Sequence, residues 1–201
     1  MQFKIILASS NPGKAAEFRA LAAAGATSVP VEIGLLPELA FLPAFAEDAP
    51  TFAENAAGKA LHYSRLADGL VFADDSGLVV PALRGAPGVR SARYAGASAS
   101  NAERIAKLLQ ELSGKTGAER RAYFVCAIAL AEKGRAVAIV TDRADGEILE
   151  EPRGGGGFGY DPVFYFPALK KTFAELLPQE KNQHSHRGKA FRKLLTALPK
   201  Q

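Results

Sequence analysis

Cysteine is almost absent from this sequence, and its scarcity excludes two kinds of stabilised fold. The single cysteine, Cys126, has no partner in the chain for a disulfide bond. With only three histidines beside it, it cannot form a cysteine-rich zinc site. We therefore expect a reducing, cytoplasmic location.

Long hydrophobic runs are also missing. The longest, from Ala122 to Ala131, is about half as long as a membrane-spanning helix needs to be. Four apolar residues separate Lys4 from Ser9, too few for the core of a signal peptide. We expect no membrane partner. The 201 residues, 48% hydrophobic and 23% charged, predict one domain spanning 1–201 or two small lobes.

The net charge of +4 is concentrated near the end of the chain. Eight Lys or Arg and two Glu lie between Lys170 and Gln201. Such a segment favours an anionic partner, namely a nucleotide, a nucleic acid or a membrane surface, or else forms a solvated helical face. Because no nucleic-acid recognition motif is present, a nucleic-acid-binding module is the remote alternative, and we expect no nucleic-acid partner.

The order of apolar patterns predicts a mixed α/β fold. We expect strands at 3–8, 28–33, 70–73, 78–83, 121–131, 135–142 and 162–166. Helices are expected at 15–24, from Thr51, at 100–112 and at 188–198. Thr51 with Glu54 and Ser100 with Glu103 have the spacing of capping boxes. The turn at 132–134 predicts an antiparallel hairpin.

Two turns contain residues suited to phosphate chemistry. The segment from Ser9 to Lys14 follows a strand and opens a helix, where backbone N–H groups bind anions. It lacks the Walker spacing and is equally typical of a structural turn. Asp74 and Asp75 end a predicted strand, where adjacent carboxylates repel unless a cation such as Mg²⁺ lies between them. Glu47 could add a carboxylate, but a solvated Asp-Ser-Gly turn is the alternative.

Two later segments contain residues suited to a nucleobase. Glycines at 154–157 precede Phe158, which could stack on a base, although a hairpin loop with core aromatics fits the same residues. Downstream of Lys181, His186 and Arg187 stand just before the last predicted helix, where they offer donors for a carbonyl edge. A helix cap at Ser185 with both side chains in solvent is the alternative.

Together these blocks resemble the inosine triphosphate pyrophosphatase family, which includes the bacterial dITP/XTP pyrophosphatases. The resemblance runs from Ile5 to about Leu195. Six blocks carry it, in the same order as in the family: 7–14, 51–56 with Lys59, 73–78, 85–88 with 91–94, 157–162, and 180–181 with 185–188.

The resemblance implies a mixed central sheet flanked by helices, two lobes around a nucleotide cleft, and a homodimer. It also implies Mg²⁺-dependent hydrolysis of dITP, ITP and XTP to monophosphate and pyrophosphate. Asp75 would be the catalytic base or a metal carboxylate, and Glu47 a metal ligand. The substrate-binding residues would be Ser9, Ser10, Asn11, Pro12, Gly13, Lys14, Ser76, Phe158, Gly159, Tyr160, Asp161, Lys181, His186 and Arg187.

The chain departs from the family pattern at a few positions. Ser10 and Pro12 replace a glycine and a small residue that are more frequent there, and one glutamate, Glu47, stands where two are common. A Maf-like pyrophosphatase acting on pyrimidine or modified nucleotides also opens with Leu-Ala-Ser-Ser. The Ser-His-Arg-Gly and Phe-Gly-Tyr-Asp blocks favour the purine-specific family over that alternative.

Overall fold

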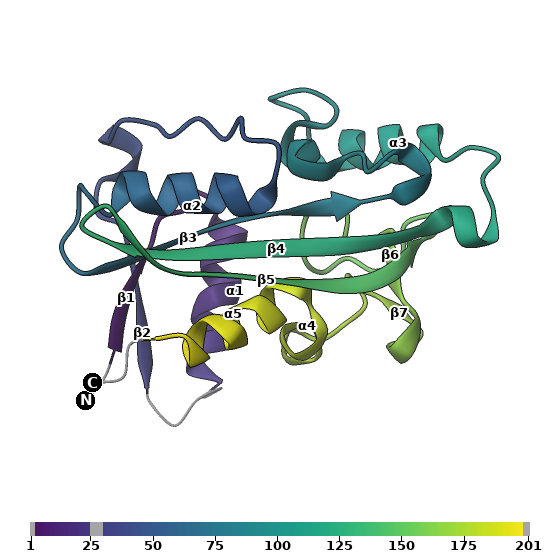
Figure 1. Cartoon of the computed structure of the whole chain (residues 1–201). Coiled ribbons are helices and arrows are strands. Elements are labelled where there is room, and N and C mark those ends of the chain that lie inside the picture. Colours follow the sequence, from purple (N-terminus) through teal and green to yellow (C-terminus); the bar gives the residue numbers. More distant parts are fainter. Residues whose placement is uncertain (1–2, 25–29, 199–201) are drawn as a thin grey trace. The chain divides into compact units, whose positions relative to one another are not determined.

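The computed structural model describes residues 3–24 and 30–198. The strands of this described part form one mixed sheet in the order β2-β1-β3-β4-β5-β6-β7 (Figure 1). β1 pairs in parallel with β2 and β3, and β6 pairs antiparallel with β5 and β7. The predicted α/β class is confirmed. The strands are β1 (Phe3–Leu7), β2 (Val31–Leu35), β3 (Leu70–Val79), β4 (Arg121–Glu132), β5 (Arg135–Ile148), β6 (Phe164–Phe166) and β7 (Lys171–Thr172).

The chain divides into two compact units. The first unit consists of residues 1–75, 126–142 and 186–201, and the second of 76–125 and 143–185. The chain therefore passes from one unit to the other within β3, β4 and β5, and again between Ser185 and His186. That all 201 residues act as one domain stays a prediction.

In the first unit, the alternation of side chains along the strands builds two cores. Phe72 of β3 packs against Phe18 of α1 (Pro12–Ala23), with ring centroids 5.2 Å apart, and against Phe191 of α5 (His186–Thr196). Its neighbour Ala73 belongs to the other core, together with Ala56 of α2 (Phe52–Tyr63). Figure 1 shows α1 and α5 on one face of the sheet and α2 on the other.

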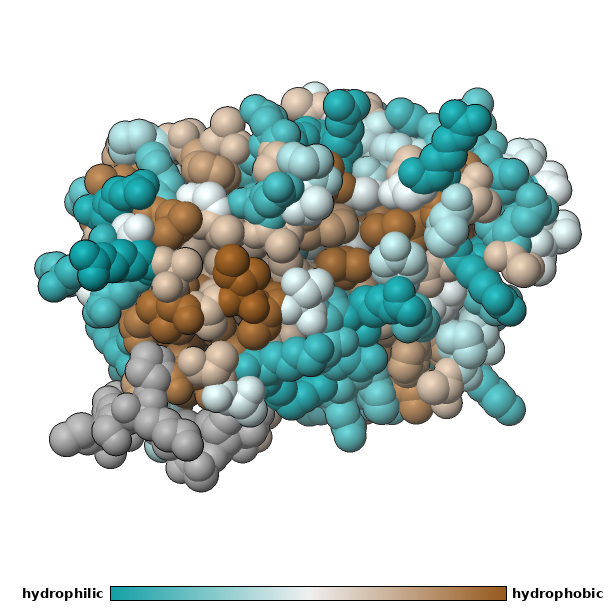
Figure 2. Space-filling view, in the orientation of Figure 1, coloured by the Kyte–Doolittle hydropathy of each residue, from teal (hydrophilic) through white to brown (hydrophobic). Residues whose placement is uncertain are grey.

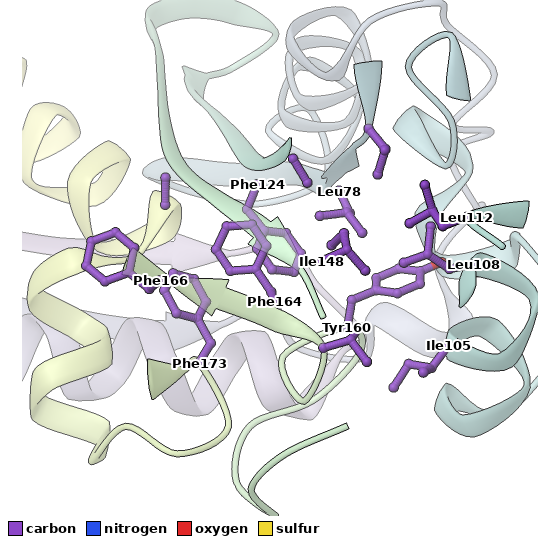
Figure 3. Packing of buried hydrophobic residues seen from close by; sticks show 14 of the residues in the cluster. Leu78, Ile105, Leu108, Leu112, Phe124, Ile148, Tyr160, Phe164, Phe166 and Phe173 are labelled. Atoms are coloured by element: carbon purple, nitrogen blue, oxygen red, sulfur yellow. The ribbon is translucent and has the colours of Figure 1, made fainter. Parts of the chain in front are cut away.

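The second unit has a core of aromatic rings. Figure 3 shows Phe124 and Phe164 side by side, and their ring centroids are 4.6 Å apart. Tyr160 points from the chain before β6 toward Leu108 of α3 (Asn101–Glu111). The Tyr160 hydroxyl donates a hydrogen bond to the Ser91 carbonyl at 3.0 Å, which satisfies its polar end in the core.

Most element predictions are confirmed, with corrections at boundaries. The capping box at Ser100 forms in both directions, and Thr51 caps α2. The first helix begins at Pro12, three residues early, because proline suits the first helical position and Asn11 caps it. The strand expected at 28–33 appears as β2 (Val31–Leu35), and residues 28–29 lie outside the described part. Helix α4 (Pro178–His184) was not predicted.

The largest correction concerns β3. Asp74, Asp75 and Gly77 do not form a turn after a short strand, because β3 continues through them to Val79. Gly77 allows this continuation: a Cβ at that position would collide with the Ser91 side chain and the Gly88 carbonyl. Both carboxylates are therefore held on a strand rather than on a turn.

The outer part of β5 exposes apolar side chains. Val137 and Ile139 are 40% and 50% exposed, whereas the alternating residues Ala138 and Val140 pack against the core that includes α5. Figure 2 shows hydrophobic residues gathered over this strand and hydrophilic ones over α5.

Within residues 3–24 and 30–198, no helix is long and apolar enough to span a membrane.

Candidate active site

The segment between β1 and α1 presents a helix N-terminus. The Asn11 side chain accepts a hydrogen bond from the Lys14 N–H at 3.2 Å, and the Ser9 hydroxyl accepts one from the Asn11 N–H at 3.3 Å. Pro12 and Gly13 form the first turn of α1. Asn11 and Pro12 are exposed, as Ser10 is. The Asn11 and Lys14 N–H groups are bonded within this segment, so the positive end of helix α1 is what it offers to an anion.

Asp74 is a fully buried carboxylate that nearby cations neutralise. Lys14 Nζ lies 2.9 Å from Asp74 Oδ2, and Arg187 Nε lies 3.8 Å from it. Burial by itself raises the pKa of Asp74, but the charges of Lys14, Arg187 and Lys59 outweigh burial and lower that pKa to about 2. Asp74 is therefore ionised, and its charge holds Lys14 beside the turn.

Asp75, the next residue, has a different environment because its side chain points to the opposite face of β3. It is 6% exposed and accepts a hydrogen bond from Asn55 Nδ2 at 2.9 Å. Burial raises the pKa of Asp75, and the negative charges of Glu47 and Asp74 raise it further, against the opposing effects of Asn55 and Lys14. A carboxylate with a raised pKa beside an ionised one is the arrangement expected of a general base.

Helix α2 contributes two residues that the sequence prediction did not assign to the site. Lys59 forms an ion pair with Glu47 and donates a hydrogen bond to the Asp74 carbonyl at 2.9 Å. Burial lowers the pKa of Lys59, but the charges of Asp74 and Glu47 outweigh it and raise that pKa. Asn55 and Lys59 are four residues apart on one helix face. Their polarity on a largely buried helix was the signal available in the sequence.

Arg187 and His186 lie in the first turn of α5, not before the helix as expected. They are 2% and 4% exposed, so neither stands in solvent. Arg187 donates to the Glu17 carboxylate on α1 and lies over the Phe18 ring, 5.8 Å from its centroid. Burial lowers the pKa of Arg187, but the Glu17 and Asp74 charges more than reverse this effect. Glu17 is a further residue that the prediction missed.

The second unit holds the other predicted binding residues. Asp161 Oδ2 accepts hydrogen bonds from Lys181 Nζ at 2.6 Å and from the Phe158 N–H at 2.8 Å. Lys181 Nζ lies 5.1 Å from the centroid of the Phe158 ring. Gly157 adopts a φ of +69°, and a Cβ there would collide with the Asp161 carboxylate. Asp161 therefore binds both the backbone of Phe158 and the Lys181 ammonium.

A cavity of about 500 Å³ borders the glycine-rich loop within this second unit. Its walls come from α3 and from the loop, and they are mostly apolar. The cavity is lined by Asn101, Ala102, Ile105, Ala106, Leu109, Pro152, Gly154, Gly155, Gly156, Gly157, Phe158, Gly159 and Pro162.

Two further predicted binding residues are Tyr160 and Ser76. Tyr160 belongs to the core of this second unit, whereas Ser76 lies in β3 directly after Asp75.

The first unit thus brings together the turn at 9–14, Glu47, both aspartates and Arg187. Among the described residues, 3–24 and 30–198, three or more His, Cys, Asp or Glu side chains do not gather into a metal site. The negative charge of Glu47 contributes to the raised pKa of Asp75. Mg²⁺ takes one or two protein carboxylates and completes its shell with water and substrate phosphates, so this pair fits it.

A sequence model of the Ham1 family matches residues 5–197. The chain belongs to the Ham1 family. It is 53% identical over 191 residues to the dITP/XTP pyrophosphatase of Geobacillus kaustophilus, covering 95% of this chain and 92% of that protein. It is 50% identical over 194 residues to the dITP/XTP pyrophosphatase of Gloeobacter violaceus, covering 96% and 92%. The family resemblance inferred from the six sequence blocks is confirmed.

Solved structures of the Ham1 family have the same fold. A HAM1 protein from Coxiella burnetii aligns with a TM-score of 0.85 at 44% identity, covering 98% of each chain. The Ham1 protein of Staphylococcus aureus aligns with a TM-score of 0.83 at 38% identity, covering 97% of each chain. The predicted mixed sheet with flanking helices is thus the fold of the family.

Proposed function

We propose that this Ham1-family chain hydrolyses noncanonical purine nucleoside triphosphates, namely dITP, ITP and XTP, to a nucleoside monophosphate and pyrophosphate. One observation supports this most directly. The two adjacent aspartates of β3 differ in their charge environment. Asp74 is ionised and pairs with Lys14, whereas the pKa of Asp75 is raised, in part by the charge of Glu47. Relatives named dITP/XTP pyrophosphatases span nearly the whole chain. Residues 1–201 act as one pyrophosphatase domain in this proposal.

The turn at 9–14 would bind the phosphates. A triphosphate carries about four negative charges, and these must be neutralised before water can approach phosphorus. The positive end of helix α1 and the ammonium of Lys14 supply positive potential at this place. Ser9, Ser10 and Asn11 add short polar side chains, and Ser76 would add a hydroxyl.

Glu47 and Asp75 would hold Mg²⁺. When bound, this ion neutralises the phosphate oxygens and the leaving pyrophosphate. Asp75 would orient a water molecule and accept its proton while the water oxygen attacks the α-phosphorus. The bond between the α-phosphorus and the bridging oxygen breaks, and pyrophosphate leaves with the bonding electrons. In the protein without bound metal, burial makes the Asp75 carboxylate more basic and raises its pKa.

For the nucleobase we propose the binding residues that the family resemblance implies. Phe158 would stack on the base, with Gly159, Tyr160, Asp161 and Lys181 shaping its surroundings. His186 and Arg187 would donate to the 6-oxo group that hypoxanthine and xanthine carry. Adenine presents a 6-amino donor instead, which leaves a buried donor unpaired at a cost of about 1–3 kcal/mol.

A pyrophosphate-release assay with ITP, dITP, XTP, GTP and ATP, with and without Mg²⁺, tests this function. We expect turnover of the first three, little turnover of GTP or ATP, and none without the metal. A preference for dTTP or UTP would instead indicate the Maf-like activity. Tight binding to DNA or RNA that falls steeply with salt, without hydrolysis, would indicate a nucleic-acid-binding module.

A further inference from the structure

One face of α2 holds the segment 43–49, which carries Glu47. The two run antiparallel: Ala49 meets Asn55, Glu47 meets Lys59, and Pro43 meets His62 further along the helix. The Phe45 ring occupies the space where a Cβ of Gly58 would stand, and the Phe45 N–H donates to the Tyr63 hydroxyl at 3.4 Å. These helix residues recur every three to four positions, so they share one face.

Asn55 is the member of this face that also reaches the strand. Its side chain is fully buried. Asn55 Oδ1 accepts a hydrogen bond from the Ala49 N–H at 2.9 Å, and Nδ2 donates to the Ala49 carbonyl at 3.4 Å and to Asp75 Oδ2 at 2.9 Å. Both amide protons and the amide oxygen are therefore engaged.

We propose that Asn55 is a positioning residue that fixes the Asp75 carboxylate and the Glu47 segment relative to each other. This inference rests on the proposed function, in which both carboxylates serve one reaction. A side-chain amide is suited to this task because it accepts from one backbone N–H while donating to a carbonyl and a carboxylate. An ionised aspartate has the same shape but lacks both donors, and it places a second negative charge beside Asp75.

Two substitutions separate the two contacts of Asn55. Asn55→Asp keeps an oxygen that accepts from the Ala49 N–H, but it removes the donor to Asp75. Asn55→Ala removes every contact. Thr51→Ala is the matched control. It weakens the same end of α2 by removing the N-cap, and the Thr51 hydroxyl that it removes bonds with Glu54 inside the cap.

The readouts are kcat and KM for ITP, the thermal unfolding temperature, and amide hydrogen exchange of residues 43–49. We expect kcat to fall roughly ten- to hundredfold in both Asn55 variants with KM changed less than about threefold. Exchange at Ala49 should accelerate in Asn55→Ala, stay slow in Asn55→Asp, and stay slow in Thr51→Ala. The control should keep kcat within about twofold.

Wild-type kcat in Asn55→Asp, or losses no larger than those of Thr51→Ala, would overturn the inference. If Asn55→Asp does not fold, Asn55→Ala decides by the same split between kcat and KM. A wild-type protein without turnover of ITP, dITP or XTP would refute the proposed function instead. Hydrogen exchange would then decide alone: acceleration at 43–49 confined to Asn55→Ala supports the positioning role, and equal exchange in all variants contradicts it.

Discussion

At the scale of single residues, Asp74 and Asp75 show how neighbours acquire different tasks. A strand sends their side chains to opposite faces, so each meets different groups. Asp74 faces Lys14 and Arg187, whose charges overcome the effect of burial and keep it ionised. Asp75 faces an amide, and burial raises its pKa. Asp74 is therefore an anchor for cations, and Asp75 is the residue that we propose as the general base.

Asp75→Asn should nearly abolish hydrolysis while the protein stays folded. The amide retains an oxygen for Asn55 but cannot accept a proton, and general bases contribute about 10²- to 10⁴-fold to rates. Stability should hold or rise, since a buried charge disappears. Pyrophosphate release at saturating Mg²⁺ and thermal unfolding check both points. Turnover near that of the wild type would rule out the assigned role.

Arg187→Ala should reduce the ITP to ATP efficiency ratio by roughly tenfold or more, at about 1.4 kcal/mol per factor of ten. Loss of a donor to the 6-oxo group lowers the efficiency with ITP, whereas the adenine of ATP makes no such bond. His186→Ala should lower the ratio in the same direction but less strongly. Because Arg187 is buried between Glu17 and Asp74, its loss should also destabilise the fold by about 3–5 kcal/mol. Comparison of kcat/KM for the two substrates measures the first effect.

Glu17→Gln is the control for Arg187. It removes the ion pair on α1 but retains the guanidinium. We expect lower stability with an unchanged ITP to ATP ratio. If both variants leave the ratio unchanged, Arg187 serves only to neutralise the buried Asp74.

At the scale of elements, α2 does more than cover the sheet. One face packs small side chains such as Ala56 and Ala60 against β3 and β4, which lets the helix lie close to the strands. Another face binds the segment 43–49 through Asn55, Lys59 and His62. The helix thus sets the position of a segment that has no regular structure around Glu47.

Gly58→Ala should destabilise the protein by about 1–3 kcal/mol, although alanine favours a helix interior by about 1 kcal/mol over glycine. The new methyl group would collide with the Phe45 ring. The double variant Gly58→Ala with Phe45→Ala should recover part of the loss relative to the sum of the single changes. Chemical denaturation of the four proteins gives the coupling energy, and strict additivity would show that the ring and the glycine do not interact.

At the scale of the whole molecule, the chain passes between two units within three strands of one sheet. The predicted residues are divided between these units. The turn at 9–14, Glu47, Asp75 and Arg187 belong to the first, and Phe158, Asp161 and Lys181 belong to the second. Each set is held by its own buried ion pairs, Asp74 with Lys14 and Asp161 with Lys181.

We also propose a homodimer, as the family resemblance implies, and a reducing cytoplasmic location, as the single cysteine suggests. The buried thiol of Cys126 is compatible with such a compartment. Light scattering coupled to size exclusion should give a mass about twice the 21.2 kDa of one chain. The mass should not change when a reductant is added. A mass of one chain at micromolar concentration would exclude the dimer.

The sequence alone determined what depends on neighbours along the chain. Helix caps at Thr51 and Ser100, the turn before α1, the hairpin of β4 and β5 and the α/β class follow from local spacing and hydrophobic period. The motif blocks were sufficient to indicate the family. Boundaries were less predictable, because the fit of Pro12 to a first helical turn competes with its role in turns.

Only the tertiary structure decided which charges meet. Glu17 and Arg187 are 170 positions apart, and their pairing arises because α1 and α5 pack on the same face of the sheet. The sequence favours a turn at Asp74 and Asp75, but both residues lie in a buried strand. There Lys14 and Arg187 neutralise the charge of Asp74, and Asn55 donates a hydrogen bond to Asp75. Such compensation depends on the topology that brings distant cations and amides to one place, and no local pattern encodes it.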